Sequence, residues 1–213
     1  NGTAKTKFGR IPISEEGVLE HEGKRFFSAR ANVLEEIEGF SMGGRPVYPY
    51  DSGVMLSLLG VRKGQKLLEA GTGSGAVAFH AWCMGAEVTS YERIPEFHEK
   101  ATANLKETGV TLIQGDIAEC GKTDFDAVFL DLKNPEEIVP PAAKCLKNGR
   151  MLGYYSPVVN EGIKGVLSDN GFIDIKGIIL DHRVLRMKKY TGIAPESLGF
   201  PGFFVWARKA EGF

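Results

Sequence analysis

Residues 67–75 read Leu-Leu-Glu-Ala-Gly-Thr-Gly-Ser-Gly, and this stretch decides the fold. A short apolar run leads directly into three glycines at alternate positions, and residues 76–84 beyond them are rich in helix-forming types. The order predicts a buried strand, a tight turn and the start of a helix. Glycines suit such a turn because they accept unusual backbone angles and let a ligand approach the main chain. The G-x-G-x-G spacing differs from the dinucleotide fingerprint G-x-G-x-x-G. A plain strand-to-helix turn could share it, so the surrounding chain has to decide.

Composition is that of an ordinary globular domain. The chain has 213 residues, 43% of them hydrophobic, and its 26 Lys and Arg residues nearly balance 27 Asp and Glu residues. Any nucleic-acid surface must therefore be a local patch. Cys83, Cys120 and Cys145 form no zinc pattern, and the four histidines show no metal spacing, so we expect no metal and a reducing compartment, the cytoplasm. No apolar run approaches membrane-spanning length, and no signal peptide is visible.

Residues 1–38 differ from the rest and predict a small N-terminal β module. Short extended segments are expected at residues 7–13, 18–21 and 24–28, separated by glycines, and one helical turn at residues 34–40. The module is too short to bury a core alone, so we expect it to pack on the main domain, residues 39–213, or on another subunit.

From residue 52 onward, predicted helices and strands alternate. The expected helices are 52–59, 74–84, 95–107, 135–146 and 158–169; the expected strands are 66–70, 86–91, 110–114, 125–131, 150–155, 172–180 and 202–207. This alternation predicts an α/β fold with a doubly wound, mostly parallel sheet, and the last two strands predict an antiparallel hairpin at one edge. Two prolines in residues 44–51 argue against a regular helix there, and Asp51 is expected to cap the helix that follows.

Four acidic residues lie at or just after the ends of predicted strands: Glu69, Glu92, Asp116 and Asp131. In open α/β sheets, ligands bind beyond the carboxyl ends of the strands, so these acids mark the expected site. Four acids would repel a phosphate group. They suit a ligand that carries hydroxyls, amines and positive charge.

Two of these acids fit parts of a nucleoside. Glu92 could accept both hydroxyls of a ribose, or it could cap the helix that follows. Asp116 could accept a hydrogen bond from the amine of an adenine while Ile117 donates its backbone N–H to the ring. It could equally be a turn residue after Gly115.

The other two acids flank the centre of the predicted site. Glu69 precedes the glycines and could hold the turn or a ligand ammonium group. Asp131 ends the most apolar strand, which would place its carboxylate at the mouth of the site. It could also cap the helix that begins at Pro135.

Several segments together resemble the tRNA adenosine N1-methyltransferases that modify position 58 of the T loop, a family of class I S-adenosylmethionine-dependent methyltransferases. The segments are residues 47–51 (Val-Tyr-Pro-Tyr-Asp), 68–76, 90–92 (Ser-Tyr-Glu), 127–132 (Ala-Val-Phe-Leu-Asp-Leu) and His182-Arg183. The glycine motif is common to the whole superfamily. Its combination with Tyr-Pro-x-Asp and Leu-Asp-Leu is much narrower.

The resemblance implies S-adenosyl-L-methionine as the cofactor, tRNA as the substrate and a homotetramer. By that resemblance the cofactor would contact Val47, Glu69, Gly71, Thr72, Gly73, Ser74, Gly75 and Ala76, with Glu92 on its ribose and Asp116 and Ile117 on its adenine. Tyr48 would face the substrate. Asp131 would lie between the methyl donor and the target base as the catalytic residue.

The chemistry expected of Asp131 needs no strong base, because adenine N1 already carries a lone pair. The methylated base is cationic. A carboxylate that accepts a hydrogen bond from the adenine N6 amine would favour the developing positive charge, and in-line positioning of the two reactants would supply the rest.

A basic segment with one aromatic residue follows the penultimate predicted strand. It contains Arg183, Arg186, Lys188, Lys189 and Tyr190. Such a loop near the site could bind phosphates and stack a base. It could equally be an ordinary solvated face.

Three departures from the family pattern keep other functions open. Residues 132–137 keep the family's proline but lack its tryptophan, the usual His-Thr before the last strand is missing around residues 199–203, and the N-terminal module is short. All three lie toward the target base. The alternatives are a methyltransferase that acts on a small molecule such as a corrin precursor, a non-catalytic RNA-binding subunit, and a nucleotide-binding enzyme of another kind.

Overall fold

The computed structural model describes residues 2–6, 9–13, 16–41, 47–187, 192–193 and 202–212. The chain divides into two compact units, Asn1–Glu36 and Ile37–Phe213. The domain boundary that the sequence suggests after residue 38 stays a prediction.

The first unit contains two antiparallel hairpins. Strand β1 (Gly2–Thr6) pairs with β2 (Gly9–Ile13), and β3 (Gly17–His21) pairs with β4 (Lys24–Ser28). Glu22 and Gly23 join β3 to β4, both with positive φ, as a two-residue hairpin turn requires. Strand β1 is not predicted from the sequence, because Gly-Thr-Ala-Lys-Thr has no alternating apolar residues.

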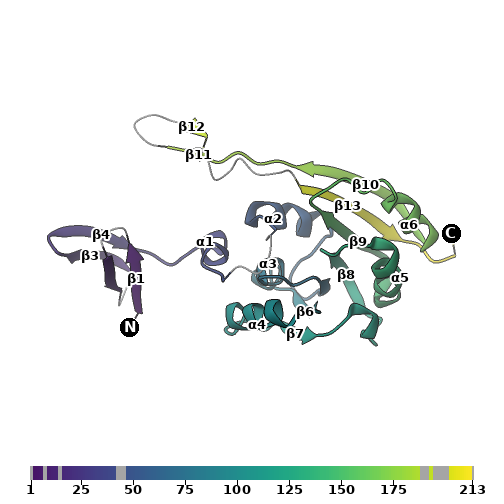
Figure 1. Cartoon of the computed structure of the whole chain (residues 1–213), viewed down its shortest axis with the longest axis horizontal. Coiled ribbons are helices and arrows are strands. Elements are labelled where there is room, and N and C mark those ends of the chain that lie inside the picture. Colours follow the sequence, from purple (N-terminus) through teal and green to yellow (C-terminus); the bar gives the residue numbers. More distant parts are fainter. Residues whose placement is uncertain are drawn as a thin grey trace. The chain divides into compact units, whose positions relative to one another are not determined.

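The second unit is built on a seven-stranded sheet with the order β10-β13-β9-β8-β5-β6-β7 (Figure 1). The strands are β5 (Lys66–Ala70), β6 (Glu87–Glu92), β7 (Thr111–Gln114), β8 (Phe125–Leu130), β9 (Leu146–Ser156), β10 (Phe172–Leu180) and β13 (Gly202–Lys209). Strands β5 to β9 pair in parallel, and β13 runs antiparallel to both β9 and β10. The predicted fold class, a mostly parallel doubly wound sheet with an antiparallel edge hairpin, is confirmed.

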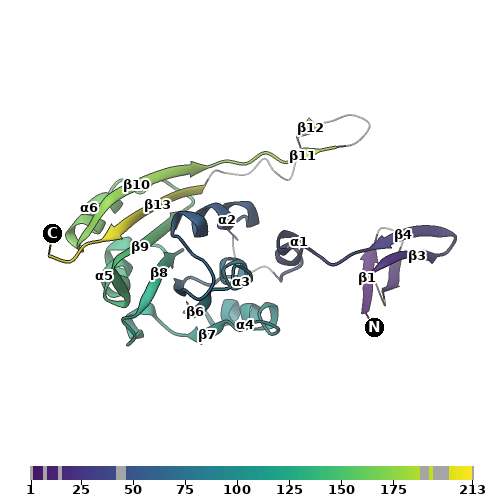
Figure 2. The same cartoon turned by 180° about the vertical axis from the view of Figure 1, so that it is seen from behind.

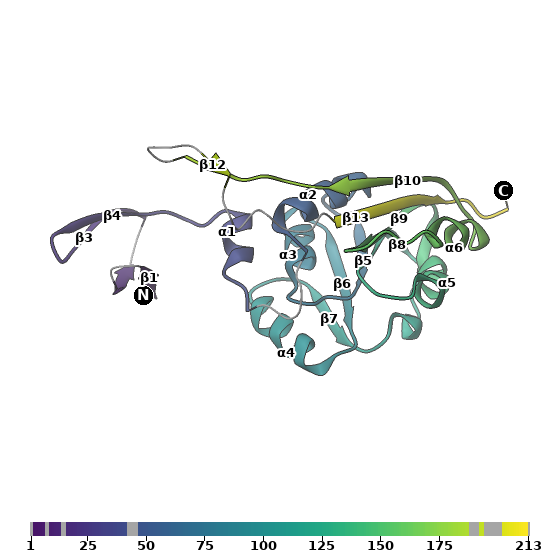
Figure 3. The same ribbon diagram turned by 45° about the horizontal axis from the view of Figure 1, so that its top comes forward.

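Helices cover the sheet of the second unit: α2 (Pro49–Leu58), α3 (Ala76–Cys83), α4 (Pro95–Asn104), the short 3-10 helix η1 (Ile117–Glu119), α5 (Pro135–Cys145) and α6 (Ile163–Asp169). Helix α1 (Val33–Glu38) spans the boundary between the two units. Helix α2 packs on α3, and α5 packs on α6 and β9. Figures 2 and 3 show α5 and α6 together beside β9 and β10, apart from α2 and α3. Beyond β10, β11 (Leu185–Arg186) pairs with β12 (Gly192–Ile193).

The sheet core has two faces because side chains alternate along each strand. Leu68, Val128 and Leu130 belong to the cluster that packs with α5 and α6. Phe129, between the last two in sequence, stacks on Phe204 of β13 instead, with 6.2 Å between ring centroids. Both faces of the central strands are therefore covered, as the continuous apolar runs predict.

The start of α2 corrects one expectation. The helix begins at Pro49 and its N-cap is Tyr48, so Asp51 lies inside the first turn and does not cap the helix. Proline fits this first position because its missing N–H would be unpaired there in any case. The prediction of no regular helix up to residue 51 is therefore wrong for residues 49–51, and residues 42–46 lie outside the described part of the chain. None of the helices described is both long and apolar enough to cross a membrane.

Candidate functional site

The candidate site lies where the chain changes direction across the sheet. From β5 the chain adds β6 and β7 on one side, and β8 and β9 extend the sheet on the other. Backbone hydrogen bonds tie the strand ends together here: Gly71 donates to the carbonyl of Tyr91 (3.0 Å), and Asp131 donates to that of Ala70 (2.9 Å). This switch point is where open α/β sheets bind ligands.

The glycine turn needs glycine for a geometric reason. Gly71, Gly73 and Gly75 have φ values of +90°, +57° and +87°, a region that other residues rarely adopt. A Cβ at Gly75 would lie 2.9 Å from a methyl group of Leu105, and one at Gly71 would collide with the main-chain oxygen of Asp131. The predicted turn therefore brings the backbone of Gly71 against the backbone of Asp131 at the base of the site.

The remaining residues of the turn are buried. Thr72, Ser74 and Ala76 are almost inaccessible to solvent. The side-chain amide of Asn104 in α4 donates to the carbonyl of Ser74 (2.9 Å), and Ala76 is the first residue of α3, with Gly75 as its N-cap. Their cofactor contacts, predicted from the resemblance, stay a prediction.

Glu69 is buried beneath the turn and hydrogen-bonded to it through Ser90. The Ser90 hydroxyl donates to the Glu69 carboxyl, and Thr72 Oγ1 lies 2.5 Å from Ser90 Oγ. Burial, with the charges of Asp131 and Glu92, raises the pKa of Glu69 to about 8. The acid is therefore neutral at pH 7, which fits the role of holding the turn better than that of holding an ammonium group.

Ser90 belongs to the site although the sequence predicts it only as part of the Ser-Tyr-Glu motif. It is fully buried in β6 and lies opposite Glu69 in the parallel register. The available signal was a small hydroxyl residue in an apolar strand whose neighbour strand carries a buried acid.

Glu92 ends β6 and bridges the glycine turn to α4. Its two carboxylate oxygens accept from the backbone N–H groups of Gly73 and Ile94, each at 2.9 Å. The N-cap residue of α4 is Ile94, so Glu92 does not itself cap the helix and the capping alternative is wrong; the ribose-binding role stays a prediction. Each oxygen keeps a second lone pair that a ligand hydroxyl could use.

Asp116 makes contacts of the ordinary turn kind. Its carboxylate accepts from the backbone N–H of Ala118 (2.9 Å), capping η1, and lies 3.3 Å from Arg93 Nη1. The side chain of Ile117 is buried in the core. The turn interpretation accounts for these contacts, and the adenine-binding role of this pair stays a prediction.

Asp131 is held by its backbone and leaves its carboxylate available. No hydrogen bond to that carboxylate is found among the described residues. Burial, together with the negative charge of Glu92, raises the pKa of Asp131 to about 7. The N-cap of α5 is Asn134, so Asp131 does not cap that helix and the capping alternative is wrong.

The loop before α2 meets the segment after β10. Val47 is buried, and the rings of Tyr48 and Tyr50 each lie 5.0 Å from that of His182. His182 Nδ1 lies 3.3 Å from Asp51 Oδ1. Tyr48 is predicted to face the substrate; its contact with His182, which lies far along the chain, is not predictable from the sequence.

The predicted basic segment is described only in part. Arg183 Nη1 pairs with Asp181 and bonds to the carbonyl of His182 (3.3 Å). Arg186 lies in β11, and nothing is described of its side chain. Lys188, Lys189 and Tyr190 lie outside the described residues. The RNA-binding role of this segment stays a prediction.

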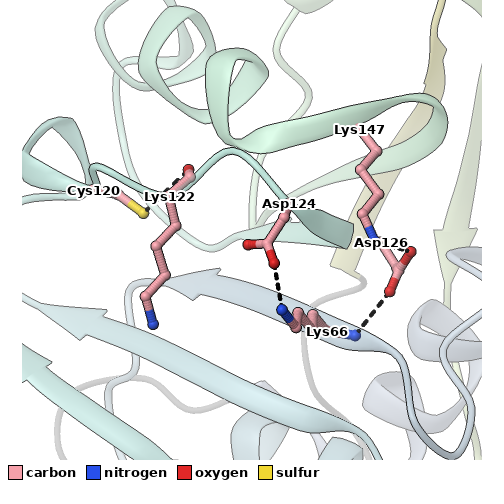
Figure 4. Close-up of polar contacts among 6 residues, drawn as sticks. All are labelled: Lys66, Cys120, Lys122, Asp124, Asp126 and Lys147. Atoms are coloured by element: carbon pink, nitrogen blue, oxygen red, sulfur yellow. Dashed lines mark hydrogen bonds and ion pairs between the residues drawn. The ribbon is translucent and has the colours of Figure 1, made fainter.

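The opposite edge of the sheet carries a separate group of ion pairs (Figure 4). Lys66 pairs with Asp124, and the Asp126 carboxylate accepts from the backbone N–H of Lys66 (3.1 Å) and pairs with Lys147 (3.0 Å). A cavity of about 660 Å³ lies at this edge, lined among others by Lys66, Trp82 and Lys122. These residues are at the amino ends of the parallel strands, away from the predicted acids. No group of His, Cys, Asp and Glu in the described chain could hold a metal ion.

Known proteins resemble this chain in sequence and in fold. Residues 44–196 match the family described as tRNA methyltransferase complex GCD14 subunit. The tRNA (adenine(57)-N(1)/adenine(58)-N(1))-methyltransferase TrmI of Methanocaldococcus jannaschii is 28% identical over 91% of this chain and 83% of its own length. The tRNA (adenine(58)-N(1))-methyltransferase TrmI of Thermus thermophilus is 32% identical over 68% of this chain and 60% of its own.

Solved structures of similar fold include two methyltransferases. The tRNA (m1A58) methyltransferase TrmI from Aquifex aeolicus superposes with a TM-score of 0.81 at 24% identity, covering 99% of this chain and 90% of the other. Precorrin-6y C5,15-methyltransferase from Geobacter metallireducens gives 0.70 at 20% identity, covering 85% and 100%. At these identities the likeness concerns the fold, so it does not separate tRNA from corrin as the methyl acceptor.

Proposed function

The chain belongs to the family of tRNA methyltransferase complex GCD14 subunits, and we propose that it transfers a methyl group from S-adenosyl-L-methionine to N1 of adenosine 58 in the tRNA T loop. The matching relatives from M. jannaschii and T. thermophilus are named for this reaction. The observation that carries the proposal is the position of Asp131 at the switch point, directly after β8, where its main-chain oxygen lies against Gly71 of the glycine turn and its N–H donates to the carbonyl of Ala70.

The residues at the switch point fit the cofactor. Asp131 and Glu92 are close enough for the charge of Glu92 to raise the pKa of Asp131, so the site gains from a bound cation. A sulfonium supplies that cation. The glycine turn leaves backbone that a ligand can approach closely. Val47, Glu69, residues 71–76, Glu92, Asp116, Ile117 and Asp131 are the proposed cofactor contacts.

Bound S-adenosyl-L-methionine supplies an activated methyl group on sulfur. Asp131 then acts on the acceptor: its carboxylate accepts a hydrogen bond from the adenine N6 amine and stabilises the positive charge that N1 methylation places on the ring. The backbone hydrogen bond from Asp131 N–H to the carbonyl of Ala70 positions the residue before the base arrives. Because the lone pair of N1 is already free, the chain needs no residue to remove a proton from it.

The partners are proposals as well. Tyr48 and the basic segment from Arg183 to Tyr190 are the proposed RNA contacts, and a homotetramer is the proposed assembly. The three cysteines form no disulfide with one another, which is compatible with a reducing compartment such as the cytoplasm.

The proposed reaction can be tested by following the label of [methyl-³H]S-adenosylmethionine. The acceptors are an unmodified tRNA transcript, the same transcript with adenosine 58 changed to guanosine, and a corrin precursor. Label that enters only the adenosine-58 transcript supports the proposal. Label in the corrin alone would establish the small-molecule alternative, and tRNA binding without label in any acceptor would indicate a non-catalytic RNA-binding subunit.

A further inference from the structure

Four side chains from distant parts of the sequence form a cluster beside α2. They are Tyr48, Tyr50 and Asp51, at the start of α2, and His182, after β10. The His182 ring makes an edge contact with Tyr48 (72° between planes) and a tilted contact with Tyr50 (39°), both at 5.0 Å between centroids. Its Nδ1 points to Asp51 Oδ1 at 3.3 Å. The Asp51 carboxylate therefore holds the ring of His182, which contacts the rings of Tyr48 and Tyr50.

The cluster lies at the same edge of the sheet as Asp131. Strands β9 and β10 are both antiparallel to β13, so β10 runs in the direction of β9 and of the parallel strands β5 and β8. Its last residue, Leu180, is therefore at the carboxyl edge of the sheet. His182 follows it, and the chain then continues into the basic segment through Arg183.

Burial of the Asp51 carboxylate destabilises the fold, so packing alone does not explain this residue. Its side chain is 5% exposed, and its Oδ2 atom is buried with no hydrogen-bond partner among the described residues. Burial raises the pKa of Asp51, Asp181 raises it further, and His182 lowers it. An unpaired buried carboxylate oxygen destabilises a fold. The position of Asp51 in the first turn of α2 offsets part of this cost, because the helix dipole favours negative charge there.

Tyr50 gives the cluster a face toward solvent. It is 42% exposed, whereas Tyr48 and His182 are half-buried around Asp51. Exposed aromatic rings next to basic residues are the usual means by which proteins stack unpaired RNA bases. The cluster therefore has a rigid, buried anchor and an accessible aromatic side.

We propose that Asp51 is a positioning residue for RNA: by fixing His182 between Tyr48 and Tyr50 it prepares an aromatic surface on which a nucleobase of the T loop stacks. The proposal rests on the proposed function, since it names part of the surface that receives the tRNA. It assigns Asp51 no contact with the cofactor or with the reacting atoms.

A double-mutant cycle tests the pair. The variants are Asp51→Ala, His182→Ala and both together, measured for KM of the tRNA, kcat, affinity for S-adenosylmethionine and melting temperature. Each single variant is expected to raise KM for tRNA by about tenfold, because each weakens one base-stacking contact. Affinity for the cofactor and kcat at saturating tRNA stay within about twofold, and the double variant is no worse than either single one.

Two further variants separate positioning from general stability. Asp51→Asn keeps an oxygen that can accept from His182 Nδ1–H, so it should restore most of the tRNA affinity that Asp51→Ala loses. Asp169→Ala, at an exposed acid at the end of α6, is the control and should match the wild type. Additive effects in the cycle, or a parallel fall of melting temperature and cofactor affinity with KM for tRNA unchanged, would overturn the proposal.

The outcome also distinguishes this inference from the proposed function. If the wild type transfers no methyl group to tRNA, the proposed function fails, and the same cycle is then measured on tRNA binding by gel shift. If the wild type is active and the cycle shows no coupling, only the role of Asp51 fails.

Discussion

Gly71 and Asp131 lie so close together that any side chain at Gly71 would collide with the main-chain oxygen of Asp131. The neighbouring backbone hydrogen bond, from Asp131 N–H to the carbonyl of Ala70, is 2.9 Å long. The proposed catalytic residue is therefore placed by the ends of two parallel strands, β5 and β8, and not by a separate loop. Gly71, the first glycine of the motif, is therefore needed to place Asp131 as well as to let a ligand approach the main chain.

Gly71→Ala should disrupt the site. The residue has φ of +90°, which costs a non-glycine residue about 1–3 kcal/mol, and the added Cβ would push Asp131 away from β5. We expect a loss of unfolding free energy of about 2 kcal/mol or more and a fall in cofactor affinity of at least about tenfold. Urea unfolding and calorimetric titration would measure the two.

Gly121→Ala is the matched control for Gly71→Ala. This exposed glycine has no positive φ, and a Cβ there would meet nothing within 4 Å. It should keep the wild-type affinity and stability. Wild-type cofactor affinity in Gly71→Ala would show that the close contact with Asp131 does not shape the site.

Asp131→Asn should slow methyl transfer without removing the cofactor. The amide has nearly the shape of the carboxylate but no charge to balance the methylated base, so kcat should fall by about a hundredfold or more. Cofactor affinity should change by only a few fold, because the glycine turn stays intact. Single-turnover transfer and calorimetry provide the two measurements, and unchanged turnover would remove Asp131 from its proposed role.

The same carboxylate should control the pH dependence of the reaction. The pKa of Asp131 is raised to about 7, so its proton is held below that pH and the ionised form prevails above it. We expect kcat/KM for the cofactor, which reports on the free enzyme, to fall by about tenfold per pH unit below 7. In Asp131→Asn this break should disappear. A wild-type profile that is flat from pH 6 to 8 would contradict the assignment.

Local sequence signals predict most of the fold. The strand, glycine turn and helix around Gly71 are found almost to the residue, because buried parallel strands give continuous apolar runs and Pro95 marks a helix start. Prolines also produced the error at α2, where Pro49 opens the helix that it was expected to exclude. Proline is tolerated both in a turn and at the first position of a helix, so the presence of Pro49 alone could not decide between the two.

Contacts between residues that lie far apart along the chain could not be predicted from the sequence. Ser90 lies between Glu69 and Thr72 only because β5 and β6 are neighbours in register, and His182 meets Tyr48 only because β10 ends at the same edge of the sheet. Asp116 carries the right residue type at the right strand end, yet its carboxylate caps η1. Position along a motif predicts where an acid lies, whereas its hydrogen-bond partners depend on the folded neighbours.

Ser90→Ala should weaken the support of the glycine turn. The change removes the donor to Glu69 and the partner of Thr72, and leaves both polar groups buried. The expected loss of unfolding free energy is about 1–3 kcal/mol, with a smaller loss of cofactor affinity. Ser57→Ala is the control, since its hydroxyl only bonds to the carbonyl of Gly53 within α2 at an exposed position. Equal stability of the two variants would mean that the buried hydroxyl contributes nothing.

Glu69→Gln should change how stability depends on pH. In the wild type the folded state keeps the Glu69 proton up to about pH 8, whereas the unfolded chain releases it near the ordinary value of 4.5. Between these values the unfolded state is favoured progressively, so the stability of the wild type falls as the pH rises, by several kcal/mol in all. Asp131 adds a contribution of the same sign, between its ordinary value of 3.8 and about 7.

Glutamine stays neutral at every pH and can still accept from the Ser90 hydroxyl. Glu69→Gln should therefore unfold with a shallower pH dependence: no more stable than the wild type at pH 5, but more stable at pH 8.5 by about 2 kcal/mol or more. Urea unfolding at four or five pH values measures both curves. Glu161→Gln, at an exposed acid away from the site, should follow the wild-type curve. Parallel curves for Glu69→Gln and the wild type would show that Glu69 is ionised in the folded protein, and its neutral role beneath the glycine turn would have to be abandoned.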